Sequence, residues 1–255
     1  MRTKRSLAWL AVALLPACEP TTAGTNPNDT QTRYYCAVRV LDLLTDAPTM
    51  DTFVAVVNDE PQAFAQVGSP VGSATATPFT VTAFEQTATG VSTAYLSQGE
   101  STVASSKAQT TTTGQRFTVI ETGATATGAT PAAALTWIPE PTATVPAGQA
   151  MVRFVLGAPS LVGAQVDVGG TSLTGAAVLG ELTGWTPIDP GAATLTLTPG
   201  TGTATSFVLP AVPAGALHTY AVATGPAATP VVLIDITEIV GGDGTAGAPI
   251  APSTP

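Results

Sequence analysis

MVRFVLGAPSLVGAQVDV, at Met151–Val168, is the clearest structural signal in this sequence. Apolar and β-branched residues crowd both ends of the stretch, and Ala158-Pro159 separates them, as is typical of two short strands joined by a turn. A looser copy, VRVLDLLTDAPTMDTFVAV, stands at Val38–Val56. The repetition predicts that one β-rich unit is used twice.

Two further motifs recur in the same order in both halves of the chain. GVSTAY at Gly90–Tyr95 matches GELTGW at Gly180–Trp185, and GQRFTVIETG at Gly114–Gly123 matches GALHTYAVATG at Gly215–Gly225. Each motif alone is short. Their shared order over roughly a hundred residues, a typical domain length, indicates two copies of one domain.

The composition favours an all-β protein. Charged residues make up only 10% of the 255 residues, whereas helical surfaces normally carry many Glu and Lys side chains. Threonine, valine, glycine and proline suit short strands and turns. The fold class predicted is therefore all-β, with two tandem antiparallel β-sandwich (immunoglobulin-like) domains. We expect Tyr95 and Trp185 to anchor their cores, and VVLIDI at 231–236 to form a strand buried on both faces.

Composition shifts divide the chain into six segments. They are a signal peptide at 1–17, a flexible polar tether at 18–33, a first sandwich at 34–140, a Pro-containing linker at 141–149, a second sandwich at 150–240 and a disordered tail at 241–255.

The first residues predict export. A basic start is followed by an apolar run too short to span a bilayer, and Leu15-Pro16-Ala17-Cys18 resembles the lipobox of bacterial lipoproteins. That resemblance implies a diacylated Cys18 at the mature N-terminus and a membrane-anchored protein of the bacterial cell envelope, facing the periplasm or the cell surface. The alternative is cleavage after Ala17 without a lipid, in which case Cys18 and Cys36 could form a disulfide. With Cys18 acylated, Cys36 is expected to be a small buried residue at the start of a strand.

The net charge limits the classes of partner. The chain carries −9 overall, and three of its eight basic residues lie in the signal peptide, which leaves five against 17 acids. Such a chain is repelled by phosphate backbones and by anionic lipid, so nucleic-acid binding and electrostatic membrane docking are not expected.

The motifs of the second half resemble a known family. The pattern V-R-x-x-x-x-A-P, then V-D-V, G-x-x-T-x-W and A-G-x-x-H-T-Y-x-V-x-x-G, is similar to domain of unknown function 4397, which occurs in exported bacterial proteins, often in tandem. The resemblance covers most of 150–236 and, more faintly, 34–138. It implies a β-sandwich and no established activity. Family members usually carry a histidine where Leu156 stands, and this chain has none there.

Catalytic chemistry finds little support in the sequence. His218 is the single histidine, so zinc clusters and histidine relays are not expected, and we predict a hydrogen-bonded structural residue. No Ser stands in a G-x-S-x-G elbow and no phosphate-binding loop occurs. We therefore predict no enzyme and no cofactor; a hydrolase with acids brought together from distant loops is the weakest alternative.

Two groups of charged residues have both structural and functional interpretations. Asp42, Asp46 and Asp51 lie in the first opening loop, where they predict a solvated loop or, alternatively, a calcium site. Arg39 and Arg153 stand in apolar company, and we expect each to pair with an acid or a backbone carbonyl; carboxylate binding is the alternative.

These observations predict a non-enzymatic structural or adhesive protein of the cell envelope, with membrane contact through its lipid and with envelope proteins or polysaccharide as partners. The alternative is a calcium- or glycan-binding module. A structural role predicts apolar patches at the seam between the domains, whereas a binding module predicts a concavity with convergent polar groups.

Overall fold

The computed structural model describes residues 35–46, 51–57, 63–66, 80–81, 85–99, 101–140, 143–225, 231–237 and 250–253. The predicted signal peptide, the tether and Cys18 lie outside the described residues. The described elements are β1 (Tyr35–Asp42), β2 (Asp51–Val57), β3 (Ala63–Gln66), β4 (Thr80–Val81), β5 (Glu85–Ala88), β6 (Gly90–Gln98), β7 (Ser101–Ser105), β8 (Gln109–Thr111), β9 (Arg116–Thr122), β10 (Ala134–Pro139), β11 (Ala150–Leu156), the 3-10 turn η1 (Pro159–Leu161), β12 (Gln165–Val168), β13 (Thr171–Ala176), β14 (Thr186–Ile188), β15 (Thr194–Thr198), β16 (Thr205–Val208), β17 (Leu217–Thr224) and β18 (Val231–Asp235).

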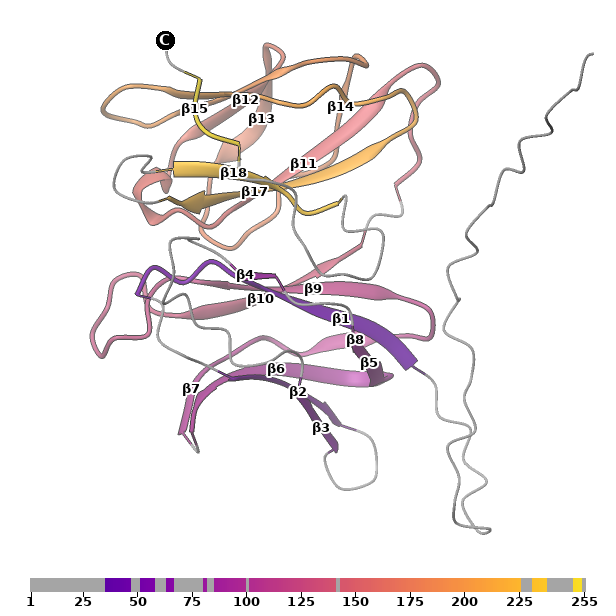
Figure 1. Cartoon of the computed structure of the whole chain (residues 1–255), viewed down its shortest axis with the longest axis vertical. Coiled ribbons are helices and arrows are strands. Elements are labelled where there is room, and N and C mark those ends of the chain that lie inside the picture. Colours follow the sequence, from indigo (N-terminus) through magenta and orange to yellow (C-terminus); the bar gives the residue numbers. More distant parts are fainter. Residues whose placement is uncertain are drawn as a thin grey trace, which may run out of the picture.

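The strands form four sheets, which confirms the all-β prediction. The first outer sheet has the order β3-β2-β6-β7, with β8 also on β6, and the first inner sheet has the order β10-β9-β1-β4, with β5 also on β1. The second inner sheet has the order β14-β11-β17-β18, and the second outer sheet β13-β12-β15-β16. Figure 1 shows them stacked as four layers, with the two inner sheets facing each other in the middle.

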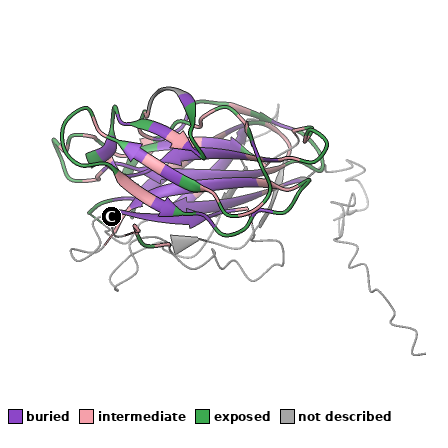
Figure 2. Cartoon of the chain, turned by 90° about the horizontal axis from the view of Figure 1, so that it is seen from above, coloured by how far each residue is buried: buried purple, intermediate pink, exposed green. Residues whose placement is uncertain are grey.

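Each half has its own core between an outer and an inner sheet. In the first half, Val38, Val54 and Phe117 belong to one buried cluster. In the second half, Phe154 and Leu197 belong to another. Seen from above, buried residues run along the strands and exposed residues gather on the turns (Figure 2). This burial follows from side chains alternating between the two faces of each strand.

Both inner sheets contain one parallel strand pair, β1 with β9 and β11 with β17, and every other named pair is antiparallel. A parallel pair needs a long crossover connection, which the strands of the outer sheet provide in each half. The registers correspond, because Arg39 lies opposite Thr118 and Arg153 opposite Thr219. The first and third repeated motifs are therefore equivalent in space.

The second repeated motif is not equivalent in space. Gly90–Tyr95 lies in β6, which pairs with β2 in the first outer sheet. The segment from Gly180 to Trp185 instead runs beside β11, where Leu182 bridges Val155. The strand that takes the place of β6 in the second half is β15, which pairs with β12. Glycine and hydroxyl residues recur often in this chain, so their spacing does not determine which strand a segment joins.

The predicted core anchors are wrong. Tyr95 is half-buried on the face of β6 opposite Leu96, which fills the core. Trp185 is half-buried and lies against Arg153. The aromatic pairs in the cores are instead Phe117 with Trp137, edge to face at 5.6 Å between ring centroids, and Phe154 with Tyr220, stacked at 5.5 Å.

Three smaller predictions fall on described residues. Cys36 is buried at the start of β1, as expected. In β18, Leu233 belongs to the second core while Val232 and Ile234 face the first half, which confirms a strand buried on both faces. Within the expected disordered tail, however, Ile250 forms a bridge with Leu233 and covers that strand edge.

Candidate functional site

Two acids lie side by side inside the first half. Asp42 ends β1 and Glu121 lies opposite it in β9, and both side chains are almost fully buried. The Thr52 hydroxyl donates to Glu121 Oε1, and the Leu44 N–H donates to Asp42 Oδ1 at 2.8 Å. Glu121 Oε2 has no hydrogen-bond partner among the described residues. A buried carboxylate oxygen without a donor is costly, so the protonation of this pair matters.

Burial keeps the two carboxyl groups neutral over part of the physiological pH range. It raises the pKa of Glu121 to about 8; the nearby Asp42 raises it further and the Thr52 bond lowers it. Burial also raises the pKa of Asp42 to about 6, opposed by the Leu44 N–H and aided by the charge of Asp46. Glu121 is therefore protonated at neutral pH, which avoids two buried negative charges in contact.

The acids proposed as calcium ligands do not converge on one site in the described part of the chain. Asp46 is exposed, and its Oδ2 accepts from the N–H groups of Thr125 and Ala126 at 2.7 and 2.8 Å and from the Thr125 hydroxyl at 3.0 Å. Asp51 begins β2, and its side chain lies outside what the structure describes. In the described part of the chain, no group of three or more His, Cys, Asp or Glu side chains is arranged to hold a metal ion.

Glu121 was missed by the sequence reasoning. It stands in an apolar strand, RFTVIET, and only the parallel register of β1 and β9 brings it to Asp42. Strand alternation predicts that Glu121 shares a face with Val119 and Phe117, both of which are in the core. This alternation in the sequence could have indicated that Glu121 is buried.

His218 is a buried structural residue, as predicted. Its Nδ1 lies 2.6 Å from Asp235 Oδ2, and its ring stacks on Tyr220 with centroids 5.8 Å apart. Asp235 Oδ1 accepts the Thr237 N–H at 2.9 Å. The pair ties β17 to the end of β18.

Arg39 connects the first half to the second. Its Nε donates to Thr118 Oγ1 at 2.8 Å, and its Nη2 lies 3.1 Å from Glu140 Oε1. The same Nη2 donates to the carbonyl of Ile236 in the second half. Burial lowers the pKa of Arg39, and the charge of Glu140 opposes that shift.

Arg153 makes the reciprocal connection. Its Nε donates to Thr219 Oγ1 at 2.9 Å, and its Nη2 donates to the carbonyl of Pro139 in the first half at 2.6 Å. Its guanidinium lies 4.5 Å from the centre of the Trp185 ring, a cation–π contact. The prediction that each arginine pairs with an acid or a carbonyl is confirmed. In each case the carbonyl belongs to the half that does not contain the arginine.

We call the space between the two inner sheets the seam. A third apolar cluster fills it. Gly157 marks a close approach there, because a Cβ on it would lie 2.3 Å from Leu43 Cδ1 and 3.0 Å from the Val222 carbonyl oxygen. The seam cluster consists of Leu41, Leu43, Ile120, Ile138, Val155, Ala221, Ala223, Val232, Ile234 and Ile236. Apolar packing and two buried arginines thus join the halves directly.

No family model matches this chain, and no curated protein is similar to it in sequence. Among the described residues, no helix has the length and apolar character needed to cross a membrane.

Proposed function

We propose that this protein is a non-enzymatic structural or adhesive component of the bacterial cell envelope, whose two sandwich modules act as one rigid body. The observation that carries the proposal is the seam. Its ten-residue apolar cluster and its reciprocal arginine contacts give the halves a shared core, rather than two modules on a loose linker. A shared core suits a load-bearing or presenting role, since relative motion of domains is the default where interfaces are small and polar.

The described acids support this proposal over calcium binding. Asp42 is buried against Glu121, while Asp46 holds the 125–126 turn through its Oδ2. Oxygen ligands for calcium need to converge from about six to eight positions. Asp42 and Asp46 are instead engaged in separate contacts.

The envelope location rests on the export signal and on Cys18. An acylated Cys18 followed by the polar 19–33 tether would hold the sandwiches a short distance from a membrane. Replacing Cys18 with Ser should move the protein from the membrane fraction to the soluble exported fraction. Retention of the Cys18→Ser protein in the membrane fraction would contradict the lipid anchor.

Thermal unfolding of a soluble form that starts at Thr21, and so lacks the signal peptide and Cys18, tests the role itself. We expect one transition whose midpoint is unchanged by calcium or by chelator. A ligand present at a hundred times its Kd would add about 2.7 kcal/mol, a shift of several degrees. A calcium-dependent shift that chelator removes would support the ligand-binding alternative instead. Two separate transitions would contradict the proposal that the two modules act as one rigid body.

A further inference from the structure

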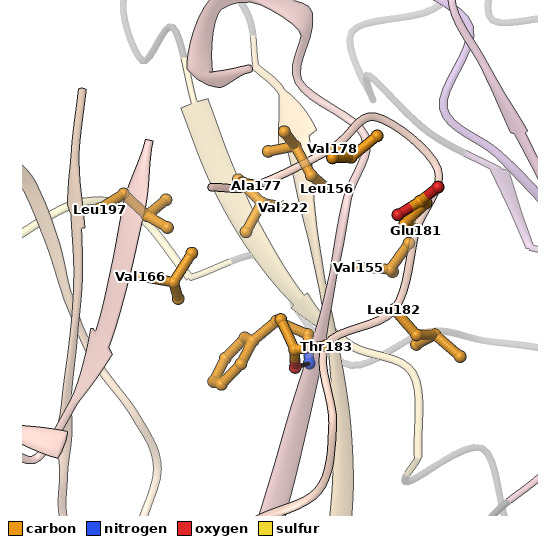
Figure 3. A pocket seen from close by; sticks show the side chains of 11 residues that line it. Val155, Leu156, Val166, Ala177, Val178, Glu181, Leu182, Thr183, Leu197 and Val222 are labelled. Atoms are coloured by element: carbon orange, nitrogen blue, oxygen red, sulfur yellow. Dashed lines mark hydrogen bonds between the residues drawn. The ribbon is translucent and has the colours of Figure 1, made fainter. Parts of the chain in front are cut away.

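An apolar cavity of about 90 Å³ lies at one end of the second sandwich (Figure 3). Its floor is made by the core side chains Leu156, Val166, Leu197 and Val222, which come from four different strands. Its roof is the 177–183 segment.

The roof is held by backbone hydrogen bonds at both ends. At one end, Ala177 exchanges bonds with the 163–164 segment, at 2.8 and 2.9 Å. At the other, the Gly180 N–H donates to the Leu156 carbonyl at 2.7 Å and the Thr183 N–H to the Phe154 carbonyl at 2.8 Å. Gly180 has φ +74°, which lets the roof turn sharply above β11. The cavity is therefore already formed and needs no rearrangement to accept a ligand.

One charged side chain lies at this cavity. Glu181 is exposed, and Figure 3 shows it at the rim near Val178 and Val155. Val178 is itself exposed, which leaves an apolar rim beside the carboxylate. Apolar side chains make up most of the lining, so a hydrocarbon group is favoured in the inner part of the cavity, and 90 Å³ accommodates about four carbon atoms.

The first half lacks an equivalent apolar cavity floor. In register, Leu156 and Val222 correspond to Asp42 and Glu121, which fill that place with carboxyl groups. Among the described residues, the apolar floor of this cavity is thus not shared by the equivalent positions of the first half.

We propose that this cavity binds a short branched alkylammonium ion, with the hydrocarbon against Leu156 and Val222 and the ammonium group beside Glu181. The alkyl group gains by leaving water, and the ammonium remains at the mouth, where it keeps part of its hydration and faces a carboxylate. This binding goes beyond the proposed structural role and does not depend on it.

The test uses isopentylamine as the probe and methyl NMR spectra of the soluble form from Thr21 as the readout. We expect saturable shifts of the Leu156, Val166 and Val222 methyl groups. Isopentylamine should bind about two- to five-fold more tightly than isopentanol, because an exposed carboxylate contributes modestly, and the anion 4-methylpentanoate should bind more weakly than either. Absence of saturable shifts at these methyls, or equal affinity for amine and alcohol, overturns the proposal.

Substitutions test the carboxylate of Glu181 and the apolar part of the cavity separately. Glu181→Gln should reduce the affinity for the amine to that for the alcohol and leave the alcohol unchanged, while Asp189→Asn, an exposed acid outside the cavity lining, should change neither. Leu156→Phe should fill the cavity and abolish both. If Leu156→Phe does not fold, Ala177→Leu fills the same space from the roof. Amine binding that survives filling in a folded variant contradicts the site.

Discussion

Each half contains an equivalent pair of parallel strands, β1 with β9 and β11 with β17, but the side chains near the end of the pair differ between the halves. Near the ends of β1 and β9, Asp42 and Glu121 lie opposite each other and are buried. At the corresponding register of β11 and β17, Leu156 and Val222 line an apolar cavity. The backbone frame is thus independent of what fills it, because it is held by ladder hydrogen bonds and by the equivalent Arg–Thr contacts nearby.

The arginine contacts are where the two halves resemble each other most, and breaking one should have the largest effect. Arg39→Ala removes the donor to Thr118 Oγ1 and to the Ile236 carbonyl, and it leaves Glu140 Oε1 with the Thr118 hydroxyl but without its cation. Arg39 is buried but Glu140 is only half-buried, so we expect a loss of about 3 kcal/mol of unfolding free energy, at the lower end of the range for a buried ion pair. Urea unfolding followed by tryptophan fluorescence would measure it, with the exposed Lys107→Ala as control. Equal midpoints for the two variants would show that the seam does not depend on Arg39.

The acid pair of the first half, which Leu156 and Val222 replace in the second, should make the stability of the protein depend on pH. The native pKa of Glu121, about 8, lies above its ordinary value of 4.5, so the native state binds more protons than the unfolded state between those pH values. Stability therefore falls as pH rises from about 4.5 to about 8. Asp42 adds to this loss between about 4 and 6.

Glu121→Gln should remove most of that pH dependence. We expect the variant to match the native protein near pH 5 and to exceed its unfolding free energy near pH 8 by on the order of a few kcal/mol. Urea unfolding at a series of pH values measures this. Glu181→Gln in the second half is the matched control and should leave the slope unchanged. A native protein whose stability rises between pH 5 and pH 8 would show that Glu121 is ionised in the fold.

The seam also has an asymmetric contact, since Leu43 of the first half packs against Gly157 of the second. Gly157→Ala places a methyl group against Leu43 and the Val222 carbonyl, and overpacking of this kind costs about 1–3 kcal/mol. Gly184→Ala has open space around it and serves as the control. Differential scanning calorimetry should show a lower midpoint for Gly157→Ala alone; an unchanged midpoint would mean that the halves are looser than the packing indicates.

The smallest effect is expected in the loop of the first half. Asp46→Ala removes three hydrogen bonds to residues 125 and 126 at an exposed position, which should cost at most about 1 kcal/mol. The loss should be the same with calcium and with chelator. A calcium-dependent difference between native and Asp46→Ala proteins would restore the calcium alternative.

Much of the architecture could be predicted from local patterns. Strict alternation in TLTLT at Thr194–Thr198 predicts that Leu195 and Leu197 share one face, and both are in the core. The repeat anticipated Arg39 and Arg153 as equivalents. The same reasoning failed for Tyr95 and Trp185, because a shared spacing of small and aromatic residues says nothing about which sheet face a side chain occupies.

The amino-acid sequence by itself determined the all-β class and several of the strands and turns, since these depend on residues close together in the chain. Only the tertiary structure decided which groups meet. Arg39 and the Ile236 carbonyl are 197 positions apart, and Asp42 faces Glu121 only through a parallel register. Every residue has a backbone carbonyl, so the sequence does not indicate which one an arginine will contact. A strand register depends on how whole sheets pack. Neither contact can therefore be predicted from a local sequence pattern.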